Sequence, residues 1–566
     1  MRYDGAFRNH SLGIESLLAF WPGLELFTTS LRLTGDDPWA PNVIPRNQIG
    51  NTDTTCCIYR LGAILKRPFI WSITVFFFAT LTKHGLCEEN HSQIETQVLR
   101  VVSTKYAGYY HKPWKAPDFV TTKSSGFFFE DEKNFPGRKG LILTNAHAVA
   151  MAQNIQVSNG REKRQYKVTP IGICNSADFA VLEMGKEDLQ TYERINGPIN
   201  PLSLGNSDAL RVGDKVTGWG YPLGGESLSK SEQGEISRIE VSRYSYSLDS
   251  WLMIQASLQQ NRGNSGGPVL KDGVVVGIAF QGMQISDRIN YFIPINLVKN
   301  LIPVLDKQHL LPSWLFVVQT LFPRLKEYYG LHTEQGGVLL DYIIPEGGPY
   351  RFGLRDQDIL LSIDGHDIDN FGEIYFEPLA QRIHFSEVLN RKMVGDPLNI
   401  KVMRHKKILD IEGTVTPGLP RLVSRIFSRP NYFIFSGIGF VELTLNCIEN
   451  LGRSGDAFRA KYAVSLPSRP HEKIVIISEI FPEYCLIESA RYLRRVKKIN
   501  GQPVLNVQDL YSTVMDLKKQ GKSRALLELE GHLVLPLDLK NAAALDLEIQ
   551  QKYGILHLRT QGGFHN

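Results

Sequence analysis

Short β-forming segments, separated by polar and Gly-rich turns, follow one another from about residue 95 to residue 305. They lie at residues 98–102, 126–129, 140–144, 179–182, 215–221 and 273–280. Segments at this spacing predict an antiparallel barrel or sandwich. No helix of useful length alternates with them, which argues against a parallel α/β sheet. Two barrels of about a hundred residues each would fit this stretch.

One serine lies in the sequence Gly-Asn-Ser-Gly-Gly-Pro at residues 263–268. Peptide hydrolysis needs a hydroxyl nucleophile beside backbone N–H groups that bind the developing oxyanion, and glycines let the backbone come close. We therefore predict Ser265 as the nucleophile, and the N–H groups of Gly263 and Ser265 as the oxyanion donors. The alternatives are a Gly-rich β-turn and the G-x-S-x-G elbow of α/β-hydrolases. That elbow leads into a helix, whereas residues 268–275 predict a β-hairpin with Asp-Gly at its turn.

A general base is expected at the end of another strand. His147 follows the apolar segment 141–144, and Asp178 comes directly before the apolar segment 179–182. A buried carboxylate of this kind would hold the tautomer of the imidazole. The rivals Asp188, Asp208 and Asp214 lie in polar, turn-like stretches, where an aspartate is usually a cap or a turn former. The chain order His–Asp–Ser is that of chymotrypsin and differs from the orders in subtilisin and the α/β-hydrolases.

Residues 144–149, 177–182 and 263–268 resemble the three catalytic blocks of the HtrA/Deg family of serine proteases. Residues 204–208, 213–216, 220–222, 234–238 and 291–294 resemble the signature of that family's second barrel. Lys112-Pro113-Trp114 and the C-terminal half are most similar to the plant-type Deg branch, also found in some bacteria. The resemblance implies a mainly β fold: a trypsin-like double antiparallel β-barrel over residues 95–305, followed by two PDZ-like α+β domains.

The same resemblance implies an ATP-independent serine endopeptidase that cleaves unfolded or damaged proteins through a Ser-His-Asp acyl-enzyme mechanism, in protein quality control. It also implies homo-oligomers built on protease trimers. No metal or other cofactor is expected, since the six cysteines are sparse and form no CxxC pair. Residues 255–262 depart from the acidic, then small and apolar run that usually precedes the Gly-Asn-Ser of the family. Arg262 stands where the family often has proline or a small polar residue. The departure bears on substrate preference and loop ordering and leaves the triad intact.

A PDZ domain is predicted over residues 312–418, because strand, short helix, strand and Asp-Gly turn follow in that order. Such a domain adds a peptide strand to its edge and captures the C-terminal carboxylate with backbone amides. The resemblance assigns Tyr329, Gly330 and Leu331 to the carboxylate loop, with C-terminal peptides as ligands. A spacer that binds nothing is the alternative.

A second, degenerate PDZ-like domain is predicted over residues 428–540, since residues 495–504 repeat the strand–turn pattern around Gly365. It is expected to serve as an assembly or docking surface. Residues 541–566 form a tail with a short helix at 542–551.

The N-terminal region resembles an export element. We predict that residues 1–65 form an N-terminal extension and that residues 66–87 form a hydrophobic signal or membrane anchor. Lys66 and Arg67 precede the apolar run 69–81, and Glu88 and Glu89 follow it. A buried helix is the alternative. We therefore expect a periplasmic or otherwise extracytoplasmic location.

The charge pattern limits the classes of partner that the chain is expected to bind. The net charge is +5 over 566 residues, and the Lys and Arg residues are scattered, so no nucleic-acid partner is expected. The expected partners are unfolded polypeptides. Three function classes remain: an active endopeptidase, a weakly active chaperone or peptide-binding scaffold on the same fold, and an esterase. The hairpin after Ser265 and the His–Asp–Ser order oppose the esterase.

Overall fold

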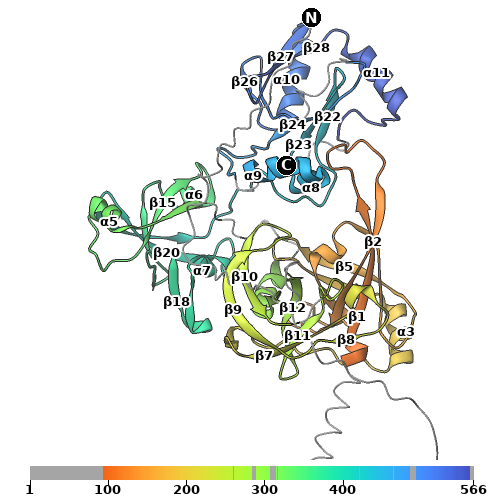
Figure 1. Cartoon of the computed structure of the whole chain (residues 1–566), viewed down its shortest axis with the longest axis vertical. Helices are drawn as coiled ribbons and strands as arrows, with labels where there is room; N and C mark the ends of the chain where they lie inside the picture. Colours follow the sequence, from red (N-terminus) through yellow and green to blue (C-terminus); the bar gives the residue numbers. More distant parts are fainter. Residues whose placement is uncertain are drawn as a thin grey trace, which may run out of the picture. The chain divides into compact units, whose positions relative to one another are not determined.

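The first barrel is a closed antiparallel sheet of six strands in the order β1-β2-β3-β6-β5-β4 (Figure 1). In the computed structural model, the residues described are 94–258, 261–282, 289–305, 307, 311, 314, 316–419, 421–462, 465–484 and 493–560. The strands are β1 (Val98–Ala107), β2 (Asp118–Phe128), β3 (Leu141–Thr144), β4 (Ala152–Ser158), β5 (Tyr166–Cys174) and β6 (Phe179–Met184). Buried apolar side chains from all six fill the interior. Two helices, α2 (Ala146–Val149) and α3 (Lys186–Asn196), follow β3 and β6.

The second barrel is built from a seven-stranded sheet in the order β11-β12-β13-β10-β9-β7-β8. Its strands are β7 (Lys215–Gly220), β8 (Ser229–Lys230), β9 (Gly234–Arg243), β10 (Ser250–Ala256), β11 (Pro268–Lys271), β12 (Val274–Gly282) and β13 (Asn290–Pro294). Because β11 also pairs with β7, six of these strands close on themselves. Helix α4 (Ile295–Leu301) follows β13.

The first C-terminal unit contains a sheet in the order β14-β15-β16-β20-β21, with β17 pairing with β16. Its strands are β14 (Phe316–Thr320), β15 (Val338–Ile343), β16 (Ile359–Ile363), β17 (His366–Asp367), β20 (Pro397–Arg404) and β21 (Lys407–Thr414), and β18 (Glu373–Phe376) pairs with β19 (Gln381–His384). Its helices are α5 (Pro323–Tyr329), α6 (Gly348–Phe352) and α7 (Ser386–Asn390). Helix α5 begins with a proline, whose fixed φ suits a first helical turn, and ends at a left-handed glycine.

The second C-terminal unit has one sheet in the order β22-β23-β24 and another in the order β26-β25-β27-β28. The strands are β22 (Tyr432–Phe435), β23 (Ile438–Glu442), β24 (Val475–Ile480), β25 (Val496–Ile499), β26 (Gln502–Pro503), β27 (Arg524–Leu529) and β28 (Val534–Asp538). The helices are α8 (Leu445–Asn450), α9 (Asp456–Tyr462), α10 (Val507–Lys519) and α11 (Ala542–Tyr553). In β27, buried and more exposed side chains alternate, as in a strand with one face on a core.

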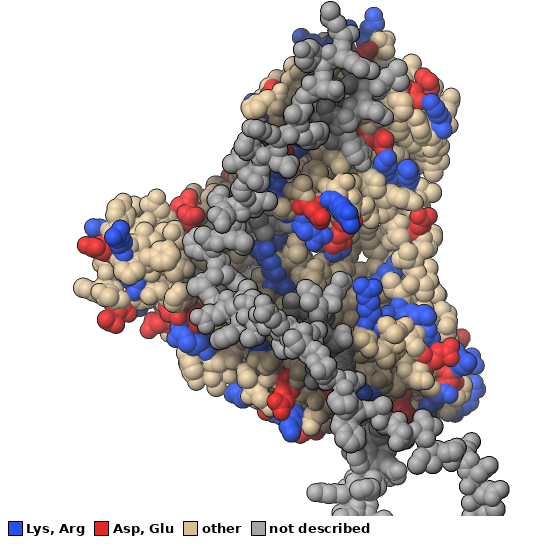
Figure 2. Space-filling model, viewed as in Figure 1, with Lys and Arg blue, Asp and Glu red and all other residues tan. Residues whose placement is uncertain are grey.

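The predicted fold class is confirmed: a mainly β chain with a double barrel and two further α+β units. The extension over residues 1–65 and the hydrophobic segment 66–87 lie outside the described residues. Within the part of the chain that the structure describes, no helix is both long and apolar enough to cross a membrane. Basic and acidic side chains are mixed over the visible face rather than gathered in one stripe (Figure 2).

Candidate active site

His147 and Asp178 meet because two neighbouring strands bring their ends together. Strand β3 ends at Thr144, which lies opposite Ala180 of β6, so the residues after β3 face those before β6. His147 lies in α2, immediately after β3, and Asp178 lies in the turn between β5 and β6 with a positive φ of 52°. Aspartate tolerates this left-handed conformation better than most residues. The local fold therefore places a carboxylate beside an imidazole.

Asp178 is fully buried, and both of its carboxylate oxygens are engaged by His147. Oδ2 lies 2.6 Å from Nδ1 of the ring, and Oδ1 accepts the backbone N–H of His147 at 2.7 Å. Asn145 donates its side-chain amide to the backbone carbonyl of Asp178 at 2.9 Å. The carboxylate thus holds Nδ1 as the protonated nitrogen and leaves Nε2 as the basic one.

The loop that carries Ser265 packs against the same strand end. A Cβ on Gly266 would lie 2.1 Å from the carbonyl oxygen of Ser125 and 3.1 Å from the backbone nitrogen of Asn145. Gly266 has a φ of 87°, and Gly263 a φ of 103°, so both positions need glycine for their backbone conformation as well. The hydroxyl of Ser265 donates to the carbonyl of Phe280 at 3.1 Å. Among the described residues, no hydrogen bond joins this hydroxyl to the ring of His147.

The predicted oxyanion donors are available. Within the described part of the chain, no acceptor is recorded for the N–H of Gly263 or for that of Ser265. Their carbonyls, in contrast, are both held by Ser125 of β2: its N–H donates to Ser265 at 2.8 Å, and its hydroxyl donates to Gly263 at 2.7 Å. The same hydroxyl accepts the N–H of Tyr221 at 2.9 Å. Ser125 therefore ties the serine loop of one barrel to a strand of the other.

Two family models match the chain: a trypsin-like peptidase domain over residues 124–278 and a PDZ domain over residues 424–562. Among curated relatives, the putative protease Do-like 3, mitochondrial, of Arabidopsis thaliana is 28% identical over 448 residues, covering 77% of this chain and 75% of that protein. Protease Do-like 4, mitochondrial, of the same plant is 29% identical over 436 residues, covering 76% and 78%. The probable periplasmic serine endoprotease DegP-like of Halomonas elongata is 29% identical over 298 residues, covering 51% and 56%.

The predicted resemblance to the HtrA/Deg serine proteases is confirmed, because the chain matches a trypsin-like peptidase domain and a PDZ domain and its curated relatives are Do-like proteases. The plant relatives agree with the predicted resemblance to the plant-type Deg branch. With its trypsin-like peptidase domain and its Do-like protease relatives, the chain is a serine endopeptidase.

The three rival aspartates have other partners. Asp188 accepts the backbone N–H of Lys167, and Asp214 pairs with Lys271 at 2.8 Å. Asp208 forms two hydrogen bonds with Arg391, at 2.8 and 2.9 Å. Of the three predicted catalytic residues, His147 and Asp178 are the two that touch directly.

Two residues that lie next to His147 could not be predicted from the sequence. Lys105 of β1 donates its ammonium to the backbone carbonyl of His147, and burial lowers the pKa of Lys105 to about 8, partly opposed by Asp178. The ring of Tyr246 lies 5.8 Å from the ring of His147. Both contacts join residues far apart in the chain, so a local motif could not have revealed them.

The predicted carboxylate loop forms the end of a helix. Gly330 is the left-handed residue after α5, and its N–H donates to Glu327. The N–H of Leu331 donates to Lys326 at 2.9 Å, and its side chain is buried. A carboxylate captured here would have to displace these bonds. The assignment of Tyr329, Gly330 and Leu331 to peptide capture therefore stays a prediction that this arrangement does not favour.

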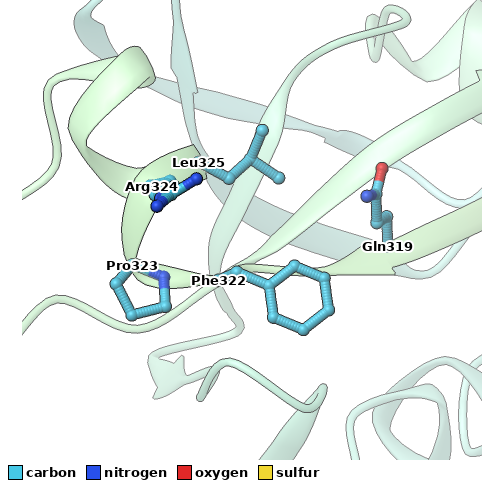
Figure 3. A pocket seen from close by; sticks show the side chains of 5 residues that line it. All are labelled: Gln319, Phe322, Pro323, Arg324 and Leu325. Carbon is cyan, nitrogen blue, oxygen red and sulfur yellow. The ribbon is translucent and has the colours of Figure 1, made fainter.

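A pocket lies a few residues earlier, where β14 passes into α5 (Figure 3). Its volume is about 580 Å³, and its lining residues are Gln319, Phe322, Pro323, Arg324 and Leu325. Strand β14 is the edge of its sheet and pairs only with β15 among the described strands. An open edge beside a pocket with one guanidinium and apolar side chains is suited to an extended peptide.

Proposed function

We propose that this protease is an ATP-independent endopeptidase that cleaves unfolded or damaged proteins through an acyl-enzyme, with Ser265 as nucleophile, His147 as base and Asp178 as the group that orients the base. The observation that carries the proposal is the 2.6 Å contact between Nδ1 of His147 and Oδ2 of fully buried Asp178, next to the serine loop. A buried carboxylate in this position also stabilises the imidazolium that forms during acyl transfer.

The chemistry begins with a rotation of the Ser265 side chain from the Phe280 carbonyl toward Nε2 of His147. Nε2 then takes the hydroxyl proton while Oγ attacks the carbonyl carbon of the scissile bond. The oxyanion that forms accepts hydrogen bonds from the N–H groups of Gly263 and Ser265. Among the described residues, these two N–H groups have no other acceptor. His147 next gives its proton to the leaving amine, and the same histidine activates the water that releases the acyl group.

Degradation of casein by the pure full-length chain tests this mechanism. Ser265→Ala and His147→Ala should each reduce the rate by several orders of magnitude, because the members of a triad act as a unit. Ser229→Ala, on the exposed strand β8, is the matched control and should keep the wild-type rate. Full activity of Ser265→Ala would exclude Ser265 as the nucleophile. Cleavage of a short-chain ester while casein is spared would favour the esterase class instead.

A second candidate function is a chaperone or peptide-binding scaffold with weak activity. One observation favours it: the hydroxyl of Ser265 is bonded to Phe280 and not to His147. Ser265→Ala decides between the two functions if it is assayed for suppression of aggregation of a reduced, unfolded protein. A scaffold would suppress aggregation at substoichiometric amounts while wild type and variant degrade casein equally slowly.

Peptide capture is proposed for the first C-terminal unit, at the open edge of β14. A C-terminal peptide would add a strand there, with its carboxylate near the guanidinium of Arg324 and apolar side chains on Phe322 and Leu325. Free-acid peptides should bind the full chain more tightly than amidated ones, and Arg324→Gln should remove the difference. Lys407→Gln, at the exposed start of β21, is the control. Equal affinity of both peptides for the wild type would mean that this unit does not recognise carboxylates.

Assembly and location complete the proposal. Homo-oligomers built on trimers are suggested by the family, and light scattering of the pure chain would measure them. A location of the protein outside the cytosol is supported by the names of three relatives, of which one is periplasmic and two are mitochondrial. Cell fractionation together with N-terminal sequencing would test both the location and the fate of residues 66–87.

A further inference from the structure

The edge strand of the second C-terminal unit is already covered by a segment of the chain itself. Residues 555–560 run antiparallel to β22, with Arg559 opposite Phe433. The N–H of Ile434 donates to Leu558 at 2.7 Å, and the N–H of Thr560 donates to Tyr432 at 3.2 Å. The N–H of Tyr432 donates to the hydroxyl of Thr560 at 2.9 Å. This segment therefore behaves as a further strand on the sheet β22-β23-β24.

Side chains hold the segment as a ligand would be held. Ile555 is buried, and Leu558 packs with it against a cluster that includes Ile434 and Ile549. The guanidinium of Arg559 lies 4.7 Å from the ring of Tyr511 on α10. The neighbouring Leu556, in contrast, is 82% exposed. Contacts at Ile555, Leu558 and Arg559 therefore hold the segment, whereas Leu556 faces the solvent.

The connection to the rest of the unit is short and bent. Helix α11 ends at Tyr553, and the next residue, Gly554, has a φ of 63° that turns the chain back toward β22. The same helix fixes the far end of β22, because Asp546 accepts the N–H groups of Ser436 and Gly437 at 3.1 and 3.0 Å. A segment tethered this closely competes with free peptides at a high effective concentration.

The two C-terminal units differ in this respect. In both, the first strand lies at the edge of its sheet, and an edge strand accepts an extended peptide through its free backbone groups. The outer edge of β14 has no strand paired with it among the described residues, whereas that of β22 is filled. We propose that residues 555–560 are a built-in ligand of the second PDZ-like unit, which takes up an external peptide strand at β22 only when this segment is released.

The contacts also specify the class of peptide that the released site would accept. It is an extended segment with an apolar residue in the place of Leu558, a cation in the place of Arg559 and a hydroxyl in the place of Thr560. No terminal carboxylate is needed, because the hydroxyl of Thr560 accepts the N–H of Tyr432. The site thus recognises an internal strand rather than a chain end. The proposal is independent of the protease mechanism.

The test uses the full chain, a chain that ends at Gly554, and a labelled peptide with the sequence of residues 555–560. Both ends of the peptide are blocked, so that capture of a free carboxylate by the first unit is excluded. Fluorescence anisotropy should show binding to the shortened chain at least tenfold tighter than to the full chain. The same peptide with aspartate in the place of Leu558 should bind neither chain.

Point variants of the full chain keep the test decisive if the shortened chain does not fold. Leu558→Gln removes an apolar contact and should raise both peptide binding and the hydrogen-exchange rate of residues 432–435. Leu556→Gln is the matched control in the same segment, and it should leave both unchanged. The proposal is overturned if a folded shortened chain does not bind the peptide, if both chains bind it equally, or if the two variants behave alike. Residues 555–560 would then be a fixed structural strand.

Discussion

Removal of the Ser125 hydroxyl should damage both the stability and the activity of the protease. Ser125 is fully buried, and its hydroxyl makes two hydrogen bonds: it donates to the carbonyl of Gly263 at 2.7 Å and accepts the N–H of Tyr221 at 2.9 Å. Ser125→Ala therefore leaves one buried acceptor and one buried donor without a partner. Each unpaired group costs about 1–3 kcal/mol, so the two together should destabilise the protease by roughly 2–6 kcal/mol.

The loss should be visible in two assays. For a unit of about 200 residues, 1 kcal/mol shifts the midpoint of thermal unfolding by about 2–4 °C, so Ser125→Ala should lower that midpoint by roughly 4–24 °C. The carbonyl of Gly263 would also be free to turn, and the N–H of this glycine is a proposed oxyanion donor. Loss of one such donor lowers kcat by about 100- to 1,000-fold, so a partial loss of orientation should cost about tenfold or more.

Ser124→Ala is the matched control for this prediction. Ser124 is the neighbouring residue on β2, and no hydrogen bond of its hydroxyl is recorded within the described part of the chain. Its removal should change the unfolding midpoint and kcat little. If Ser125→Ala resembled Ser124→Ala in both assays, the view that Ser125 ties the serine loop to the first barrel would be wrong.

Three further changes follow from the same region and from the first C-terminal unit. Asp178→Asn should lower kcat by about 10⁴-fold with little change in folding, since an amide there favours the wrong tautomer of His147; a rate near wild type would exclude Asp178. Lys105→Met should lower kcat about tenfold, because the charge-assisted bond to the carbonyl of His147 is lost, whereas an unchanged kcat would make Lys105 incidental. Burial raises the pKa of Glu387 to about 7, so this carboxyl group releases its proton at a higher pH in the folded state than in the unfolded state. The free energy of unfolding therefore falls as the pH rises from about 4.5 to 7. Glu387→Gln should flatten that fall, which amounts to at most about 3 kcal/mol, in denaturant unfolding followed at several pH values.

The parts of the site that could be predicted are those with a local signature. His147, Asp178 and Ser265 each lie at the boundary between an apolar strand and a turn of small residues, and strands can be recognised within a few residues. Ser125 and Lys105 carry no such signature. Ser125 is one polar residue on a long strand, and its partner Gly263 lies 138 positions later. The packing of the two barrels against each other brings Ser125 to Gly263, and the closure of the first barrel brings Lys105 to His147.

Gly330 illustrates a different limit. A glycine between two apolar residues is equally compatible with a ligand-binding loop and with the left-handed end of a helix. The preceding residues decide between these states: Pro323 at the first position starts α5, whose last turn then uses the amides of Gly330 and Leu331. Residue types alone suggest a carboxylate loop, whereas the hydrogen bonds that these amides make depend on where the helix begins.

A sheet edge is equally hard to judge from sequence, because its state depends on a segment elsewhere in the chain. Strands β14 and β22 are both short, apolar and first in their sheets, and nothing within them distinguishes an open edge from a filled one. The difference arises about 125 residues after β22, where Gly554 turns the chain back and Ile555, Leu558 and Thr560 find partners on that strand. One chain can thus carry two units of the same kind with different roles. Among the described residues, the outer backbone groups of β14 have no strand partner and can pair with an incoming peptide, whereas those of β22 already pair with residues 558–560.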